Sequence, residues 1–199
     1  VDREVEAFLK GRLAQMFPDF GFIGEETGGM PNPDGVFWVV DPIDGTTNFA
    51  HGFPYFCVSL ALNEGQKTVF GAVYDPLRRE LFTAIRGQGA FRNGARIHCP
   101  PRNTLVSALI ASGFPNRALG VLPRYERIYR RCLQEGAGIR RTGSAALDLA
   151  HIAAGRMDGT FQFGISLWDY AAGALLVSEA GGIVLTFPDT DSGSAQTHI

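Results

Sequence analysis

The sequence predicts a mixed α/β protein of two lobes, because its two halves carry different patterns of apolar residues. Up to about residue 100, one leading helix is followed by short apolar runs with turn residues between them, the pattern of an antiparallel sheet. Beyond that point helices alternate with strands, the order typical of α/β proteins. The change falls within residues 98–104 (HCPPRNT), so we expect an N-terminal lobe over residues 1–100 and a C-terminal lobe over 101–199.

The first half opens with a predicted amphipathic helix that ends at Pro18. Its apolar residues fall at helical spacing with charges between them: Val1, Val5, Phe8, Leu9, Leu13, Met16 and Phe17. Strands are predicted at residues 20–23, 36–40, 55–62, 68–74 and 81–85, with a Gly/Pro loop over 27–35. Residues 63–66 (NEGQ) indicate a hairpin, residues 87–89 (GQG) a hairpin corner, and Asn93-Gly94 a tight turn.

The second half is predicted to begin with a buried strand over residues 105–111 and a helix over 122–133. Ser144 opens a further helix that Gly155 closes. A strand over residues 161–163, a helix over 167–180 and a final strand over 183–187 complete the chain. Gly181 and Gly182 end that last helix.

Length and composition describe an ordinary globular protein. The 199 residues are 45% hydrophobic and 19% charged, enough for a substantial buried core. A net charge of −2 without a block of Lys or Arg excludes the usual footprint of a nucleic-acid-binding protein. Three scattered cysteines indicate a reduced, cytoplasmic protein, and no membrane-spanning segment is visible. We therefore expect neither nucleic acid nor a membrane as a partner.

Four carboxylates stand where a strand ends or a helix begins: Glu25, Asp41, Asp44 and Asp169. Two like charges about 5 Å apart cost roughly 3 kcal/mol at an effective dielectric of about 20. If the four converge, a divalent cation offsets the repulsion, and all-oxygen ligands favour Mg²⁺, Mn²⁺ or Ca²⁺ over zinc. The competing interpretation is that the aspartates form turns and that Glu25 lies on a solvated edge.

The residues around Asp44 favour a phosphate beside the metal. Gly45 lets a ligand approach the backbone closely, and Thr46 or the next threonine would cap a short helix whose first N–H groups bind an anion. Pro42 fixes the turn so that the Ile43 carbonyl points inward as a neutral ligand. A metal beside a helix N-terminus is the arrangement that phosphoryl chemistry requires.

Two later helix starts extend this hypothesis. Asp169 lies in the first turn of a predicted helix, where the macrodipole favours an acid, so a capping role is the alternative to metal binding. Gly143 and Ser144 precede another helix in the same manner. Such a pair is usually only a cap, but here it is also a second candidate surface for the substrate.

Three ordered motifs resemble the inositol monophosphatase family of the magnesium-dependent, lithium-sensitive sugar-phosphatase superfamily. They are residues 24–27 (GEET), 38–49 (WVVDPIDGTTNF) and 168–173 (WDYAAG), the last followed by residues 179–182 (EAGG). The resemblance covers nearly the whole chain. It implies an α-β-α-β-α layered sandwich, usually a homodimer, in which both lobes form one catalytic unit that hydrolyses a phosphate monoester with Mg²⁺.

The resemblance also implies roles for individual residues. The metal ligands would be Glu25, Asp41, the Ile43 carbonyl, Asp44 and Asp169. Gly45 and Thr46 would bind phosphate through backbone amides, and Gly143, Ser144 and Ala145 would touch the substrate's ring hydroxyls. Asp2 would pair with Thr46, and Glu26 would lie near the more weakly held metal. In the implied mechanism, two or three metals assist water attack, and Glu25, Thr46 and Asp2 orient the water.

The sequence departs from the family pattern in two respects. Where the family usually has a glutamate that accepts hydrogen bonds from inositol hydroxyls, this chain has Gln162, which is neutral and can donate. The chain also lacks the family's first helix and its last strand and helix, so it is truncated at both termini relative to the family.

These observations predict an inositol-1-monophosphatase-like hydrolase that acts on a small phosphate monoester. The alternative substrates within the superfamily are fructose 1,6-bisphosphate, histidinol phosphate, NADP(H) and 3′-phosphonucleotides. A non-catalytic binding module is the alternative from a different class. The complete set of motif residues argues against it, because a module without catalysis need not retain every ligand.

Overall fold

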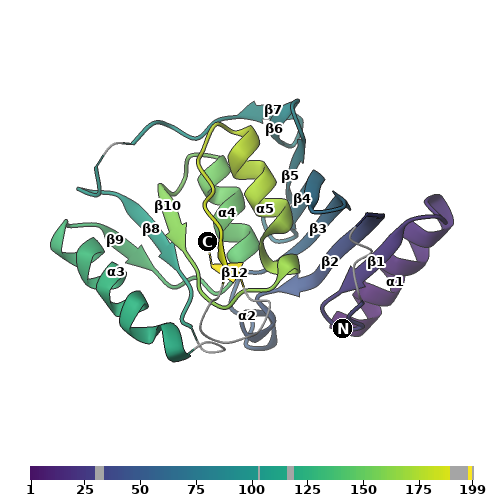
Figure 1. The fold of residues 1–199 in the computed structure, drawn as a ribbon, viewed down its shortest axis with the longest axis horizontal. Helices are drawn as coiled ribbons and strands as arrows, with labels where there is room; N and C mark the ends of the chain where they lie inside the picture. Colours follow the sequence, from purple (N-terminus) through teal and green to yellow (C-terminus); the bar gives the residue numbers. More distant parts are fainter. Residues whose placement is uncertain (30–33, 103, 116–118, 189–196, 199) are drawn as a thin grey trace.

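A computed structural model describes residues 1–29, 34–102, 104–115, 119–188 and 197–198. Figure 1 shows five layers from right to left: helix α1 (Asp2–Met16), a large sheet, helices α4 (Ala145–Ala153) and α5 (Leu167–Glu179), a small sheet and helix α3 (Leu122–Gln134). This is the α-β-α-β-α order that the resemblance implies, and the mixed α/β prediction is confirmed. No helix among the described residues is long and apolar enough to cross a membrane.

The large sheet has seven strands that lie side by side in chain order. Its first two strands, β1 (Gly21–Gly24) and β2 (Val36–Asp44), run parallel, and every later neighbour is antiparallel. The remaining strands are β3 (Cys57–Glu64), β4 (Lys67–Asp75), β5 (Glu80–Ile85), β6 (Gly89–Arg92) and β7 (Ala95–Ile97). The predicted hairpins at residues 63–66, 87–89 and 93–94 join β3 to β4, β5 to β6 and β6 to β7.

The small sheet has three parallel strands in the order β10 (Gly159–Phe161), β8 (Leu109–Ser112) and β9 (Gly138–Arg140). Short elements complete the description: α2 (Thr46–Ala50), the 3₁₀ helix η1 (Leu119–Val121), and the paired β11 (Phe187–Pro188) and β12 (Thr197–His198). Helix α4 joins β9 to β10, so its N-terminus is placed between the two sheets.

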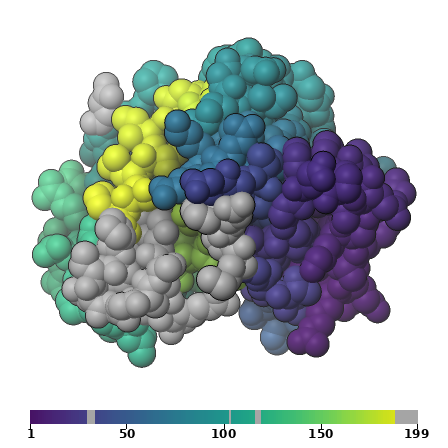
Figure 2. Space-filling view, turned by 45° about the vertical axis from the view of Figure 1, so that its right-hand side comes forward, coloured from purple at the N-terminus to yellow at the C-terminus, as the bar shows by residue number. Residues whose placement is uncertain are grey.

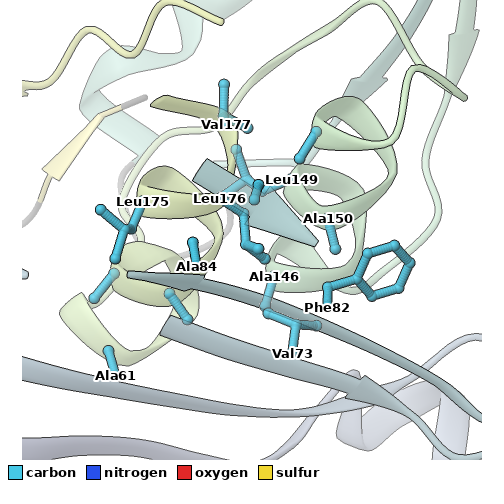
Figure 3. Packing of buried hydrophobic residues seen from close by; sticks show 14 of the residues in the cluster. Ala61, Val73, Phe82, Ala84, Ala146, Leu149, Ala150, Leu175, Leu176 and Val177 are labelled. Carbon is cyan, nitrogen blue, oxygen red and sulfur yellow. The ribbon is translucent and has the colours of Figure 1, made fainter. Parts of the chain in front are cut away.

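The main core lies between the large sheet and the helix pair α4–α5. Figure 3 shows Val73 and Phe82 of the sheet beneath Ala146 and Leu149 of α4 and Leu176 of α5, and all five side chains are nearly inaccessible. Helix α5 can approach β4 closely because Gly71 has no side chain, since a Cβ there would lie 2.9 Å from the Ala172 carbonyl oxygen. At the first turn of α5, the Ser59 hydroxyl of β3 donates to the Trp168 carbonyl at 3.2 Å, which holds that turn against the sheet.

Several predicted boundaries need correction. The predicted strand over residues 183–187 is wrong: residues 183–186 pair with no strand among the described residues, and only Phe187 enters β11. Its side chains are correspondingly open, with Ile183 86% exposed, and the yellow C-terminal segment lies at the surface in Figure 2. An apolar run forms a strand only where a neighbour supplies backbone partners.

Smaller differences have similar causes. The predicted strands over residues 105–111 and 161–163 are displaced to β8 and β10, and β9 was not predicted. Strand β2 extends four residues beyond its predicted end, through the aspartates. In α1, Val5, Leu9 and Leu13 face inward, whereas Phe8 is 66% exposed. Part of the predicted Gly/Pro loop, residues 30–33, lies outside the described residues.

Candidate functional site

Three aspartates meet between the end of β2 and the start of α5. Asp41 and Asp44 lie in the last four residues of β2, where the pairing with β3 shifts register, and both side chains are buried. Asp169 lies in the first turn of α5. One carboxylate oxygen from each residue falls within 4.8 Å of those from the other two. The structure thus brings together three of the four carboxylates that define the predicted site.

Each aspartate is oriented by hydrogen bonds from the chain. Asp41 Oδ1 accepts from the Ile43 backbone N–H at 3.0 Å. Asp44 Oδ2 accepts from Ser144 Oγ and from the Ala146 backbone N–H, both at 2.7 Å. Asp169 Oδ2 accepts from the Ser166 N–H at 2.7 Å, which is half of a capping box. Capping and clustering are therefore compatible uses of Asp169.

The cluster is electrostatically strained in the metal-free protein. Burial, followed by the charges of Asp44, Glu25 and Asp169, raises the pKa of Asp41 well above its usual value. Burial and the charge of Asp169 raise the pKa of Asp44 to about 7, against the opposing hydrogen bonds from Ser144 and Ala146. These carboxyls hold protons at a pH where ordinary aspartates have lost them.

Glu25 joins the cluster from the neighbouring strand. It follows β1, and its backbone N–H donates to the Val40 carbonyl at 3.2 Å, immediately before Asp41 on β2. Its side chain is close enough to raise the pKa of Asp41 after burial and the charge of Asp44, and it lines the same cavity as the aspartates. The parallel pairing of β1 with β2 therefore brings the fourth carboxylate to this edge of the sheet.

A carboxylate that the sequence interpretation did not single out holds the turn carrying Glu25. Glu6 of α1 is fully buried, and its two oxygens accept from the backbone N–H groups of Glu26 and Thr27, both at 2.9 Å. A methyl group at Gly24 would overlap the Glu6 carboxylate. The available signal was an acid on the inward stripe of α1, between Val5 and Leu9.

Glu26 and Asp2 are placed differently from the cluster. The Glu26 side chain is 25% exposed and forms an ion pair with Arg3 at 3.1 Å. Asp2 lies at the start of α1 and is not among the described residues that line the cavity. The Thr46 hydroxyl donates to the Ile43 carbonyl at 3.0 Å, so in this structure its donor is directed there and not to Asp2. The predicted pairing of Asp2 with Thr46 stays a prediction.

A sharp turn follows the second aspartate. Gly45 has φ of 102°, a left-handed conformation, and a Cβ there would lie 3.0 Å from the Tyr55 carbonyl oxygen. Gly45, and not a threonine, is the N-cap of α2, and no side chain caps that helix. The predicted threonine cap is wrong because Thr46 is already helical and uses its hydroxyl on Ile43.

The opposite wall of the cavity comes from the C-terminal half. The cavity has a volume of about 700 Å³ and is lined there by Gly143, Ser144, Ala145 and Gln162. Ser144 caps α4 by accepting from the Leu147 N–H at 3.3 Å while it donates to Asp44. Gln162 is 4% exposed, and its Nε2 donates to Thr160 Oγ1 at 3.1 Å.

A partly buried polar network ties this wall to the segment after α2. Asn48 Nδ2 donates to the Tyr55 carbonyl at 2.6 Å and to the Thr142 carbonyl at 2.8 Å. Asp148, which is 1% exposed, accepts from the Tyr55 hydroxyl at 2.7 Å and from Thr142 Oγ1 at 2.6 Å. Burial raises the pKa of Asp148 to about 6. Its signal in the sequence was one acid within the otherwise apolar start of α4.

The donor set fits a hard divalent cation. Two carboxylates no more than 4.8 Å apart repel each other by about 3 kcal/mol or more at an effective dielectric of about 20. Protonation relieves that repulsion in the free protein, and a cation with oxygen ligands would relieve it more fully. Within the described residues, no His or Cys belongs to this cluster, which disfavours zinc.

Known proteins resemble this chain in both sequence and fold. The model of the inositol monophosphatase family matches residues 1–195. "Nus factor SuhB" of Escherichia coli strain K12 is 47% identical over 188 residues, which cover 94% of this chain and 70% of that protein. The crystal structure of SuhB from Bartonella henselae is 45% identical with a TM-score of 0.87, covering 93% of this chain and 71% of that one.

A further solved structure resembles this chain and carries the name inositol monophosphatase. The structure of inositol monophosphatase from Anabaena sp. PCC 7120 is 37% identical, with a TM-score of 0.89, covering 99% of this chain and 79% of that chain. The family match spans almost every residue, and the acid cluster lies within it. This chain belongs to the inositol monophosphatase family.

Proposed function

We propose that this protein is a Mg²⁺-dependent phosphate monoester hydrolase of the inositol-1-monophosphatase type. The observation that carries the proposal is the cluster of Asp41, Asp44 and Asp169, whose oxygens lie within 4.8 Å on the wall of a cavity that Gly45 and Thr46 also line. Hard oxygen donors beside the N-terminus of a short helix, whose first N–H groups have no partner within the helix, suit a metal and a phosphate together.

Mg²⁺ would be held by the four carboxylates and one carbonyl of the cluster: Asp41, Asp44, Asp169, Glu25 and the Ile43 carbonyl. When bound, it neutralises phosphate charge and lowers the pKa of a water molecule. Backbone N–H groups of Gly45 and Thr46 bind the phosphate oxygens. The alcohol half of the substrate lies against Gly143, Ser144, Ala145 and Gln162, which line the other wall.

Glu25, Thr46 and Asp2 orient the attacking water. Because the Thr46 hydroxyl donates to the Ile43 carbonyl, its oxygen remains able to accept a hydrogen bond from that water. Glu25 stands beside Asp41 on the same edge of the sheet and accepts the one proton that the water gives up as it attacks phosphorus. Glu26 supports the outer part of the site through its place in the turn that Glu6 holds. An Asp2→Asn variant, assayed for turnover and for unfolding temperature, tests whether Asp2 belongs to this group.

Phosphate release from a panel of substrates, measured with Mg²⁺ and with EDTA, tests the proposal. The panel contains inositol 1-phosphate, fructose 1,6-bisphosphate, histidinol phosphate, NADP⁺ and 3′-phosphoadenosine 5′-phosphate. We expect Mg²⁺-dependent release led by inositol 1-phosphate. Gln162 is neutral and lines the cavity, so the preferred substrate can differ from inositol 1-phosphate. Faster release from another compound of the panel would support the Mg²⁺-dependent hydrolysis and change only the substrate assigned to it.

A matched pair of aspartate variants provides the control. Asp44→Asn removes one charge from the cluster, whereas Asp75→Asn removes a buried aspartate that holds the turn at Leu77 and Arg78. We expect only the first to lose turnover at saturating Mg²⁺. Absence of release from every substrate by a folded wild-type protein would contradict the proposal.

A role as a Nus factor is a second candidate, favoured by the name of the 47% identical relative. Residues 122–141 carry six arginines and only two glutamates in a chain of net charge −2, so positive charge is concentrated in this region. The Asp44→Asn variant separates the two functions. Complementation of a strain that lacks the Nus factor by this variant would show that the role does not need the metal site.

Further properties of the family extend the proposal. We infer sensitivity to lithium, a homodimer and a cytoplasmic location, supported by the family match and the reduced cysteines. We also retain an N-terminal lobe over residues 1–100 and a C-terminal lobe over 101–199, a division supported by the two sheets on either side of it. Lithium inhibition curves, sedimentation and limited proteolysis test these properties in turn.

A further inference from the structure

The side chain of Asn48 joins the two walls of the cavity. Asn48 lies in α2, directly after the turn at Gly45. Its Nδ2 donates to the Tyr55 carbonyl at 2.6 Å, in the same half of the chain, and to the Thr142 carbonyl at 2.8 Å, on the opposite wall. Both hydrogens of the amide group are therefore used, and one of them bridges residues that lie 94 positions apart.

Gly143 leaves the space that this bridge occupies. Its φ is 98°, and a Cβ there would lie 2.7 Å from Asn48 Nδ2 and 3.1 Å from Asn48 Oδ1. A side chain at this position would displace the amide and would be strained by the left-handed backbone. The amide of Asn48 is thus packed directly against the backbone of the wall assigned to the alcohol half of the substrate.

A buried carboxylate repeats the bridge between the same two residues. Asp148 Oδ1 accepts from the Tyr55 hydroxyl at 2.7 Å and from Thr142 Oγ1 at 2.6 Å. Tyr55 and Thr142 each offer a carbonyl to Asn48 and a hydroxyl to Asp148. The two residues are therefore linked twice, and Thr142 is held from both sides.

A further hydrogen bond closes a ring around the turn at Gly45. Ser144 Oγ donates to Asp44 Oδ2 at 2.7 Å. Asp44 and Asn48 flank the turn, so the bridge to Thr142 and the bridge from Ser144 leave from its two ends. The segment that would bind phosphate is thus tied at both ends to the wall that would bind the alcohol.

We propose that Asn48 is a positioning residue that fixes the phosphate-binding turn relative to the wall that binds the alcohol half of the substrate. The proposal rests on the phosphatase function proposed above and adds a residue to its machinery. The ester oxygen joins a phosphate held on one wall to an alcohol held on the other, so hydrolysis needs both walls aligned with the attacking water. A misplacement of about 1 Å can cost about a hundredfold in rate. Loss of Asn48 should therefore lower kcat more than it weakens the binding of either half.

Kinetics that separate alignment from binding test this. We would measure kcat and KM for inositol 1-phosphate, and the inhibition constant of inorganic phosphate, with wild type, Asn48→Ala and Asn48→Leu. Leucine is similar in size to asparagine but has no donor, so it separates the hydrogen bonds from the filled space. We expect both variants to lower kcat about tenfold and to change KM and the inhibition constant by about twofold at most.

Asn93→Ala is the matched control. Asn93 also links two backbone segments, because it accepts from the Leu81 N–H at 2.8 Å and donates to the Arg79 carbonyl at 3.3 Å. It is exposed and is not among the described residues that line the cavity. Asn93→Ala should lower the unfolding temperature and leave the kinetic constants as in wild type. An equal loss of kcat in Asn48→Ala and Asn93→Ala, an unchanged kcat in Asn48→Ala, or a rise in the inhibition constant as large as the fall in kcat would overturn the proposal.

Hydrogen exchange of the metal-free protein provides a readout independent of turnover. Both Asn48 variants should speed exchange in residues 45–49 and in residues 142–146 together, whereas Asn93→Ala should leave both segments protected. Gly143→Ala displaces the amide without removing it, so it should speed exchange in residues 45–49 across the cavity, and it serves if the Asn48 variants do not fold. Release of phosphate from no substrate by wild type would refute the phosphatase function. Exchange would still decide the bridge, because unchanged protection in these variants would overturn it.

Discussion

Removal of the Glu6 carboxylate should weaken Mg²⁺ binding without touching a metal ligand. Glu6 accepts two backbone hydrogen bonds of 2.9 Å from the turn that carries Glu25, and it is fully buried. A hydrogen bond to a charged group contributes about 1.5–3 kcal/mol, so the pair contributes about 3–6 kcal/mol. A domain is stable by only about 5–15 kcal/mol, so Glu6→Gln is more useful than Glu6→Ala.

The glutamine variant keeps one acceptor oxygen and places an NH₂ group against the second N–H. It should therefore lose about 3 kcal/mol of stability and release the turn at Glu26 and Thr27. The displacement of Glu25 should in turn weaken Mg²⁺ binding. If this costs about 1.4 kcal/mol of binding free energy, the Mg²⁺ concentration for half-maximal activity rises about tenfold. Mg²⁺ titrations of phosphate release and of the unfolding temperature measure both quantities.

A second carboxylate of the same design is the control. Glu179 accepts from the backbone N–H groups of Gly87 and Gly89, both at 2.8 Å, at a turn on the far side of the large sheet from α1. Glu179→Gln should lower the unfolding temperature but leave the Mg²⁺ dependence as in wild type. Gly24→Ala, which pushes on Glu6, should reproduce the Mg²⁺ effect. The same Mg²⁺ dependence in the Glu6 and Glu179 variants would refute the reasoning.

Three further predictions concern the cluster and the network beside it. Asp44→Asn should abolish turnover yet raise the unfolding temperature in EDTA, because it removes a buried charge that Asp169 repels; a lower temperature in EDTA would contradict this. The raised pKa values of Asp41 and Asp44 mean that the folded, metal-free protein binds more protons than the unfolded chain, so its stability falls as pH rises from about 4 to about 7. Mg²⁺ competes with those protons, so its affinity by calorimetry should rise over the same interval, and a flat profile would oppose the assignment. Tyr55→Phe removes the hydrogen bond to Asp148 and should cost about 1–2 kcal/mol in urea unfolding, whereas a smaller loss than that of an exposed Tyr74→Phe would exclude a role for the network.

Local sequence was sufficient to predict most elements and to single out the aspartates that the structure brings together. Residues 38–49 combine a buried strand, two aspartates and a glycine, and this local pattern is enough to indicate a metal beside a phosphate turn. The hairpins at Gly65 and Asn93-Gly94 could likewise be predicted, because the turn type depends mainly on the residues within the turn. The seven-stranded sheet follows in chain order from those turns.

The local pattern of residue types could not predict contacts between residues that are distant in the sequence. Glu6 meets residues 20 and 21 positions away, and Ser144 meets Asp44 at a separation of 100. Each of these side chains has an ordinary local interpretation, as a helix acid or as a cap, that the sequence cannot distinguish from its long-range use. The contact of the Arg141 guanidinium with the Phe114 ring, at 5.4 Å, is another contact between residues far apart in the sequence.

The final apolar run is a case in which the local pattern predicted a strand that does not form. Residues 183–187 have the composition of a strand, yet only Phe187 pairs, because a strand requires a neighbour's backbone groups and these are not encoded in the run itself. The sequence by itself determined which residue types could do chemistry and which segments could form elements. The tertiary structure alone decided which of them meet, because burial, pKa and hydrogen bonding depend on partners that the fold brings from elsewhere in the chain.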